Sequence, residues 1–182
     1  MHKRFLGAAL AAAIFLLLPI AGLASNQAAP SPPGQAVFEG HTIDLSKGWG
    51  DAHACLVANG AGVVECFRDQ AGLLARESQL QEQASADPAI AASTCSTPLR
   101  LYADTGYGGR ELDFYDRGYW QNLSDWSFDN QTSSYKVGAC GVYLADGANG
   151  GGSWYPGNTN AGASASSMVS GWNDRISSLY IQ

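Results

Sequence analysis

The sequence predicts a mainly β protein, with a β sandwich or barrel in its C-terminal half and a small hairpin and helix before it. Residues 95–182 consist largely of short strand-like runs that alternate with Gly, Asn and Asp turns, and they hold 14 of the 19 aromatic residues. The same half repeats itself, and four cysteines add a possible disulfide framework. The clearest strand-like runs are Leu99–Tyr102, Glu111–Tyr115 and Ser133–Val137.

Composition excludes several classes of protein. The formal net charge is −6, from 10 basic and 16 acidic residues. Non-specific nucleic-acid binding needs clustered Lys and Arg, so no nucleic-acid partner is expected. With 46% hydrophobic residues the chain has enough apolar side chains for a packed core.

Residues 1–24 have the pattern of a signal peptide. A charged start at His2–Arg4 precedes the apolar stretch Phe5–Leu18, and small residues precede a cleavage point after Ala24. We therefore expect a secreted, extracellular protein with no membrane association after cleavage. An uncleaved anchor is the alternative, but the apolar segment is short for a membrane span.

The rest of the chain divides by composition into four segments. Residues 25–40 are predicted to be a Pro-rich linker and residues 41–87 a small hairpin and helix segment. The stretch 86–97 is small and polar, and residues 88–94 within it are predicted to be a second linker. Residues 95–182 form the repeated β domain.

Within residues 41–87, the run Thr42–Leu45 predicts a strand, and a Gly-rich turn between Cys55 and Cys66 predicts a hairpin. Asp69 is the expected N-cap of a helix that Pro88 ends. The charged side chains expected on the solvated face of this helix are Arg76, Glu77 and Glu82.

The four cysteines allow three disulfide pairings. The hairpin favours Cys55 with Cys66, which leaves Cys95 with Cys140. A zinc site that includes His41 and His53 is the alternative, and it is disfavoured because the sequence has no CxxC spacing.

The repeat is the most informative feature of residues 95–182. Phe128–Ser134 aligns with Trp172–Ser178 at an offset of 44 residues. Upstream, Tyr102 aligns with Tyr143 and Gly109 with Gly150, both at an offset of 41, and we attribute the difference to an insertion in the polar tract 157–167. Two such units, neither able to bury its face alone, should pack as one domain.

Each unit is predicted to begin with a folded hairpin. In the first, Tyr102 and Tyr107 precede Gly109 at a spacing that suits a tight turn with an aromatic ring over the bend. Together with the repeated motif, this pattern makes residues 95–182 resemble a βγ-crystallin domain with two Greek keys. The nearest resemblance is to secreted microbial forms, including a peptidase-inhibitor family that shares the fold. In the second hairpin Ala148 stands where an aromatic is expected, so Trp154 or Tyr155 should pack that corner.

The resemblance implies two calcium sites built from the repeated motifs, whose oxygen-bearing groups suit this ion. Each motif has one carboxylate, so we expect modest affinity, and a motif kept only for the fold is the alternative. The resemblance also implies that Ser134 and Ser178 bond the hairpin of the neighbouring unit, and that Thr132 and Ile176 point into the core. The implied ligands are Asp129, Asn130, the Gln131 carbonyl and Ser133 in the first motif, and Asn173, Asp174, the Arg175 carbonyl and Ser177 in the second.

No enzyme is expected. The sequence has no HExxH or GxSxG motif, and Asp113 and Asp116 are expected to be a solvated surface pair. We predict a calcium-binding module with a structural or binding role. The alternative, implied by the resemblance, is an inhibitor of an extracellular metalloproteinase, with a protease or a cell-surface component as partner, although the tract 157–167 is expected to be too flexible for an inhibitory loop. The aromatic candidates for a carbohydrate or protein surface, more often core residues, are Tyr119, Trp120, Trp126, Trp154 and Tyr155.

Overall fold

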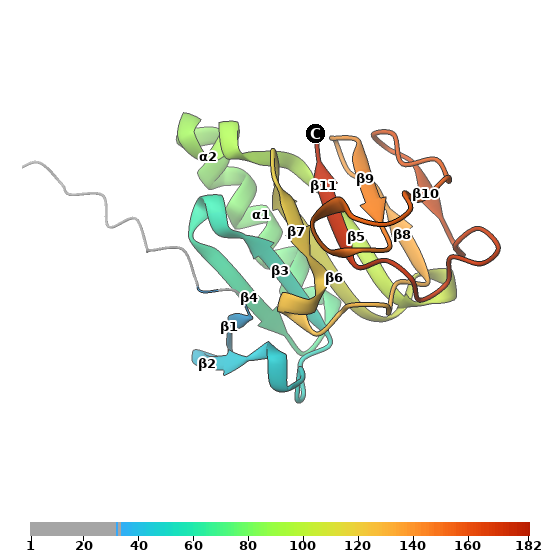
Figure 1. Ribbon diagram of the computed structural model, residues 1–182. Helices are drawn as coiled ribbons and strands as arrows, with labels where there is room; N and C mark the ends of the chain where they lie inside the picture. The colour runs from blue at the N-terminus through green and yellow to red at the C-terminus, as the bar shows by residue number, and fades with distance from the viewer. Residues whose placement is uncertain (1–31, 33) are drawn as a thin grey trace, which may run out of the picture.

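A computed structural model describes residue 32 and residues 34–182 (Figure 1). The predicted signal peptide and most of the first predicted linker lie outside the described residues. The elements along the chain are β1 (Gln35–Phe38), β2 (His41–Asp44), β3 (Ala54–Ala58), β4 (Val63–Phe67), α1 (Gln70–Ala86), α2 (Pro88–Ser93), β5 (Thr94–Asp104), β6 (Gly108–Asp116), β7 (Trp120–Asn122), β8 (Ser134–Lys136), β9 (Val142–Ala145), β10 (Ser164–Ala165) and β11 (Ser178–Ile181).

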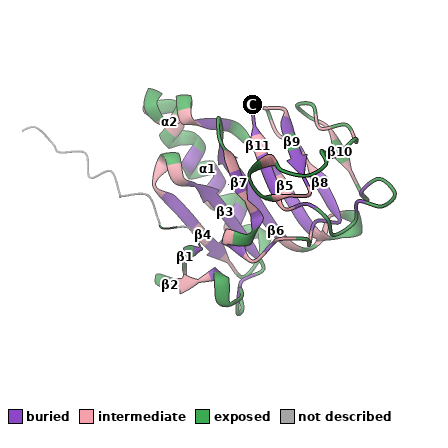
Figure 2. Ribbon diagram, in the orientation of Figure 1, coloured by how far each residue is buried: buried purple, intermediate pink, exposed green. Residues whose placement is uncertain are grey.

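The strands form two sheets, and the mainly β prediction is confirmed. Sheet A has eight strands in the order β10-β8-β5-β6-β3-β4-β1-β2, and sheet B has three in the order β7-β11-β9. Sheet B packs on one face of sheet A, and α1 lies against the other face (Figure 1). The buried residues concentrate on the strands between these layers (Figure 2).

The two repeat units exchange strands between the sheets. β7 belongs to the first unit but pairs with β11 of the second. In return, β10 of the second unit pairs with β8 of the first. This reciprocal exchange is the reason that neither unit closes a sheet alone, and it gives the predicted pair of Greek keys.

Sheet A continues without a break into the N-terminal segment. β3 pairs in parallel with β6, and Leu56 lies opposite Asp113. Every residue of β3 is buried, as is usual for a strand covered on both faces. Cys55 and Val57 join the sandwich core, whereas Leu56 and its alternate neighbours join the core beneath α1.

Both predicted linkers contain regular structure, so these two predictions are wrong. β1 lies inside residues 25–40. This segment is a strand because it pairs in parallel with β4 and buries Ala36. α2 occupies residues 88–93, where Asp87 caps the helix by accepting from the Ala89 N–H at 2.8 Å. Pro88 fits the first helical turn, in which its missing N–H has no partner to lose.

The predicted helix is confirmed, with one correction to its surface. Asp69 caps α1 by accepting a hydrogen bond from the Gly72 N–H at 2.9 Å. Glu77, predicted to be solvated, is buried together with Leu73 and Leu80 on the face that packs on sheet A. Among the residues that the structure describes, no helix has both the length and the apolar character needed to cross a membrane.

Both favoured disulfides are present. Cys55–Cys66 joins the neighbouring strands β3 and β4. Cys95–Cys140 joins β5 of sheet A to the segment that leads into β9 of sheet B. Because all four cysteines are oxidised in these pairs, no thiolate is available for the zinc alternative.

Candidate functional site

The two repeated motifs form loops that lie against each other. The Asn130 N–H donates to the Ile176 carbonyl at 3.0 Å, and the Asp174 N–H donates to the Thr132 carbonyl at 3.1 Å. The residues of the first bond are the repeat counterparts of those in the second, so the two loops are related by a pseudo-twofold axis. The two motifs are therefore joined through their backbones.

The loop backbone adopts the same unusual conformation in both motifs. Asn130 has φ 55° and its counterpart Asp174 has φ 54°. This left-handed region is disfavoured for most side chains, but short polar side chains such as Asn and Asp tolerate it best. The conformation brings the adjacent side chains together: Asn130 Nδ2 donates to Asp129 at 3.0 Å, and Asn173 Nδ2 donates to Asp174 at 2.6 Å.

The first motif leaves one carboxylate oxygen without a partner. Asp129 Oδ1 is buried and accepts no hydrogen bond from the described residues, and the same holds for Thr132 Oγ1. A buried carboxylate oxygen without a donor is costly unless a cation or an ordered water satisfies it. The unpartnered Asp129 oxygen is therefore the feature of the loops that suits a hard cation such as calcium.

The second motif reaches the first through side chains as well. Ser133 Oγ donates to Asp174 Oδ1 at 3.1 Å, so two predicted ligands from different motifs are neighbours. Within the described residues, no cluster of three or more His, Cys, Asp or Glu side chains could hold a metal. A cation bound here would therefore take most of its ligands from carbonyls and hydroxyls.

The side chains of Gln131 and Arg175 are engaged elsewhere, so only their carbonyls remain as predicted ligands. Gln131 accepts from Arg110 and donates to the Ser127 carbonyl at 3.2 Å. Arg175 bonds Asp146 at 2.5 Å and lies over the Trp172 ring, 4.8 Å from its centroid. The remaining predicted ligands, Asn173 and Ser177, are exposed and half-buried respectively.

The final serine of each motif holds a folded hairpin. Ser134 Oγ donates to the Asp104 carbonyl at 2.6 Å and accepts from the Tyr107 N–H at 3.0 Å. Ser178 does the same with the Gly147 carbonyl and the Gly150 N–H, at 2.6 and 3.0 Å. The structural role is confirmed, but each serine bonds the hairpin of its own unit rather than that of its neighbour.

Thr132 and Ile176 are fully buried, as the resemblance implies. Ile176 is part of the sandwich core. These buried side chains anchor the paired loops to the core of the molecule.

The hydrogen bonds that Ser134 and Ser178 make to the two hairpins correct the sequence alignment of these hairpins. Tyr107 is the counterpart of Gly150, and the strand register makes Tyr102 the counterpart of Ala145, an offset of 43 rather than 41. The short 3-10 turns Thr105–Tyr107 and Ala148–Gly150 agree with this offset. The predicted three-residue insertion therefore shrinks to one residue, and the missing aromatic is at Gly150 rather than at Ala148.

Trp120 and Trp154 pack the corner that lacks an aromatic. A Cβ added to Gly150 would lie 2.3 Å from the Trp120 ring. Trp154 Nε1 donates to the Gly150 carbonyl at 2.9 Å. The expected role of Trp154 is thus confirmed, whereas Tyr155 is buried against Tyr135 and Trp172 instead.

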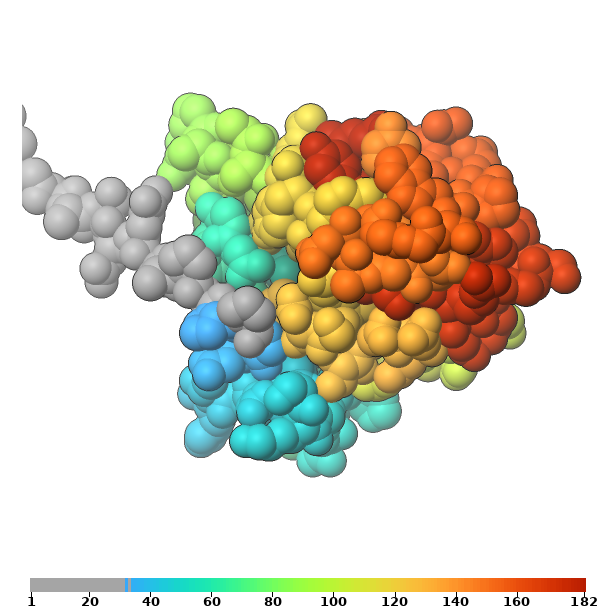
Figure 3. Space-filling view, viewed as in Figure 1, coloured from blue at the N-terminus to red at the C-terminus, as the bar shows by residue number. Residues whose placement is uncertain are grey.

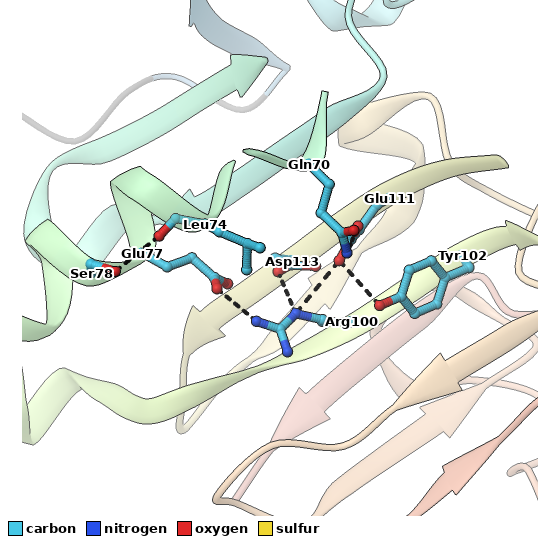
Figure 4. A network of polar contacts seen from close by, with 8 residues as sticks. All are labelled: Gln70, Leu74, Glu77, Ser78, Arg100, Tyr102, Glu111 and Asp113. Carbon is cyan, nitrogen blue, oxygen red and sulfur yellow. Dashed lines mark hydrogen bonds and ion pairs between the residues drawn. The ribbon is translucent and has the colours of Figure 1, made fainter. Parts of the chain in front are cut away.

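A second polar cluster lies between α1 and sheet A (Figure 4). Arg100 contacts Glu77 at 2.6 Å, Asp113 at 3.0 Å and Glu111 at 3.5 Å, and Tyr102 donates to Glu111 at 3.1 Å. Sequence reasoning missed this cluster. Alternation along β6 places Glu111 and Asp113 on one face, but only the packing of α1 shows that this face is covered.

The cluster contains more acids than bases. Burial raises the pKa of Asp113 well above its ordinary value, and the Glu111 charge adds to the shift. Burial also raises the pKa of Glu111. For Arg100, burial alone would lower the pKa, but attraction to Asp113 and Glu77 raises it overall. The cluster therefore favours a proton on one of its carboxyl groups.

Asp113 and Asp116 are not the solvated pair that the sequence predicts. Both are buried. Asp116 accepts from the Asn59 N–H at 2.8 Å and the Gly60 N–H at 2.9 Å, which fixes the turn between β3 and β4 to the end of β6. These acids serve the packing of the two halves.

The polar tract 157–167 is held at several points, contrary to the expected flexibility. The Asn158 carbonyl accepts from Tyr135 at 2.7 Å, and the Thr159 carbonyl accepts from the Val142 N–H at 3.0 Å. The Gly162 N–H donates to the Gly138 carbonyl at 2.9 Å, next to the short strand β10.

The C-terminal half has a βγ-crystallin-like fold, as its paired hairpins, paired loops and exchanged strands indicate. No family model and no curated protein matches the chain. A βγ-crystallin from Ciona intestinalis is 20% identical, with a TM-score of 0.40 over 47% of this chain and 99% of that one. The N-terminal domain of protein S is 18% identical (TM-score 0.39, 47% and 94% covered). A βγ-crystallin domain from Flavobacterium johnsoniae is 22% identical (TM-score 0.36, 46% and 92% covered).

Proposed function

We propose that residues 95–182 are a calcium-binding module of a secreted, non-enzymatic protein with a structural or binding role. The buried, unpartnered Asp129 Oδ1 beside the paired loops carries this proposal. Calcium accepts six to eight oxygen ligands at flexible distances, and the loops supply carboxylate, amide, hydroxyl and carbonyl oxygens.

Calcium bound to the folded chain stabilises it by mass action. At ten times the dissociation constant the gain is about 1.4 kcal/mol, equivalent to a rise of roughly 3–5 °C in the melting temperature. With few carboxylates per motif, we expect a dissociation constant on the order of 0.1–1 mM.

Calorimetric titration of the oxidised full chain with calcium, together with thermal melts in calcium and in chelator, tests the proposal. Ser133→Arg and Ser177→Arg should each remove the contribution of their own site, and Asp129→Asn should weaken binding. Asp125→Asn removes the same charge four residues upstream and should bind as the parent does. A melting temperature that does not respond to 10 mM calcium would refute the proposal.

Secretion is supported by the two disulfides, which are typical of oxidising compartments. Expression of the full chain in a bacterial host should release a product into the periplasm or medium that begins at Ser25. N-terminal sequencing checks the cleavage point, and a product that retains Met1 in the membrane fraction would support the anchor instead.

One observation favours the inhibitor as a second candidate. The exposed tract around Asn158–Gly162 is anchored by hydrogen bonds on both sides, and a pre-organised loop is what an inhibitor presents to a protease. Incubation of a thermolysin-like protease with the oxidised chain tests this candidate. Full protease activity at high micromolar protein would eliminate it.

A further inference from the structure

Four aromatic side chains form a continuous layer on the outward face of sheet B, which we call the aromatic platform: Trp120, Tyr143, Trp154 and Tyr180. Tyr180 on β11 lies opposite Trp120 on β7 and opposite Tyr143 on β9, so these rings make one row across all three strands. Trp154 lies next to the row through its bridge to Ala145.

The rings pack against one another at tilted angles. Trp154 lies 5.7 Å from Trp120 and 5.1 Å from Tyr143, and Tyr180 lies 5.7 Å from Trp120 and 6.2 Å from Tyr143 (centroid distances). Each ring therefore touches two others, which fixes the orientation of all four. The hydrogen bond from Trp154 Nε1 to the Gly150 carbonyl adds a further restraint.

The platform is open to solvent. Trp154 is 53% exposed and Tyr143 is 40% exposed, which places them among the few large hydrophobic side chains with this much free surface. Trp120 and Tyr180 are half-buried beneath and beside them. In Figure 3 the segments around β7, the start of β9 and the end of β11 (yellow, orange and dark red) meet on the face toward the viewer.

Two amide side chains border the platform. Asn122 Nδ2 donates to Asn149 Oδ1 at 3.0 Å, and the Asn149 N–H donates to Asn122 Oδ1 at 2.7 Å. Asn122 follows Trp120 on β7, and Asn149 belongs to the hairpin that contacts Trp120 through Gly150. Oriented polar groups thus lie next to exposed ring faces.

The chemistry of the platform selects an uncharged ligand. Its four rings and two amides carry no formal charge, and the chain as a whole carries −6. A polyanion would be repelled by the net negative charge of the protein. Sugar rings have an apolar C–H face that stacks on Trp and Tyr and hydroxyl edges that hydrogen-bond amides.

The size of the platform argues against a protein occupant. The exposed parts of Trp154 and Tyr143 amount to on the order of 200 Å². A stable protein interface, including a dimer of this chain, buries about 800 Å² on each partner. Two or three sugar rings match the smaller area.

We propose that the aromatic platform is a binding site for a neutral polysaccharide, with Trp154 and Tyr143 as the stacking residues. The site is separate from the paired loops and from any calcium bound there. Because the rings are already ordered by their mutual stacking, little conformational entropy is lost when a ligand binds.

Affinity electrophoresis of the oxidised full chain in gels that contain hydroxyethylcellulose, laminarin, xylan or glucomannan tests the proposal, with chitin beads as a pull-down and alginate as a charged comparison. We expect binding to at least one neutral polymer, a change in tryptophan fluorescence on binding, and no retardation by alginate. Trp154→Ala and Tyr143→Ala should each weaken binding at least tenfold, whereas Trp154→Phe should restore most of it.

Leu74→Ala is the matched control, because Leu74 is a 45% exposed hydrophobic side chain on α1. It should bind as the parent does, and thermal melts establish that every variant is folded. The proposal would be overturned if the chain bound none of the neutral polymers, or if Trp154→Ala bound as tightly as the parent. So would concentration-dependent dimerisation that Trp154→Ala abolishes, since the face would then be an interface between copies.

Discussion

On sheet A the face that turns away from the sandwich core is covered by α1, whereas the corresponding face of sheet B is open to solvent. Across sheet A one row of paired residues runs from Leu56 through Asp113 and Arg100 to Lys136. Across sheet B the row consists of Trp120, Tyr180 and Tyr143. The covered face therefore carries buried charges, and the exposed face carries stacked rings.

This difference follows from what each face can satisfy by itself. Arg100 and Asp113 need further polar partners, and α1 brings Glu77 to them. The rings of sheet B satisfy one another by stacking and need no covering element. On sheet A, α1 supplies the polar partner that the buried charges require, whereas the aromatic face of sheet B stays exposed to a ligand.

The largest loss of stability is expected from Arg100→Met, on the covered face of sheet A. The substitution keeps most of the side-chain volume but leaves Glu77, Glu111 and Asp113 without their cation. Removal of one partner from a buried charge cluster destabilises by about 3–5 kcal/mol. Urea unfolding of the oxidised chain at neutral pH measures the loss.

Lys47→Met provides the control. Lys47 pairs with Asp44 at 3.0 Å, but its side chain is 82% exposed, and exposed pairs contribute at most about 1 kcal/mol. Similar losses in the two variants would mean that the cluster beneath α1 is solvated and that the two faces do not differ as described.

A smaller loss of stability is expected from Gly150→Ala, at the point where the second hairpin meets the aromatic platform. Gly150→Ala adds a Cβ that would lie 2.3 Å from the Trp120 ring, at a residue with φ 77°. We expect a loss of about 2–3 kcal/mol from overpacking, and a weaker polysaccharide interaction because Trp120 must move. Urea unfolding and tryptophan fluorescence measure the two effects.

Gly106→Ala separates steric overlap from backbone strain. Gly106 has φ 70° but no atom within 4 Å of an added Cβ, so only strain of about 1 kcal/mol is expected. Tyr107, the counterpart of Gly150, already carries a side chain at φ 65°. Equal losses in the two variants would indicate that strain, and not Trp120, requires the glycine.

This hairpin also illustrates how far the sequence could predict the fold. The motif offset of 44 residues could be read correctly because an aromatic, an Asn/Asp pair and a Ser pair recur in the same order. The hairpin offset could not, because Ala145 and Gly150 share no chemistry with their counterparts Tyr102 and Tyr107. Their equivalence rests on hydrogen bonds to Ser134 and Ser178, which only the structure reveals.

The same limit applies to the N-terminal half and to the candidate sites. The Cys55–Cys66 disulfide and the Asp69 cap follow from local patterns and were predictable, and Cys95–Cys140 then followed by elimination. The parallel pairing of β3 with β6 is a long-range contact with no local signal, so the burial of Asp113 and Glu77 was not predictable. The oxygen-bearing residues of the paired loops could be named from the repeat, whereas the partnerless oxygen of Asp129 depends on packing.

A modest effect on stability is expected from Trp154→Ala. The side chain is 53% exposed and contributes mainly through its stacking with Trp120 and Tyr143. Loss of aromatic pairs at the surface costs about 1 kcal/mol. A loss of 3 kcal/mol or more in urea unfolding would show that the ring supports the fold, and the platform would then resemble the covered face of sheet A.

The covered face should also change how the free energy of unfolding depends on pH. Burial raises the pKa of Asp113 in the folded chain above its ordinary value of 3.8, so the folded state holds a proton that the unfolded state has released. The free energy of unfolding should therefore fall as pH rises from about 4 through the raised pKa of the folded state, and level off above it. Asp113 Oδ1, which is buried without a hydrogen-bond partner among the described residues, is the atom on which we expect this proton.

Asp113→Asn imitates the protonated carboxyl and has no proton to lose, so its unfolding free energy should vary less between pH 4 and pH 8 than that of the parent. The indole side chain of Trp154 has no ionisable group. Trp154→Ala should consequently lower the free energy of unfolding at every pH, while its dependence on pH stays that of the parent. Thermal and urea melts across this range measure both slopes, and a slope in Asp113→Asn equal to that of the parent would show that another group holds the proton.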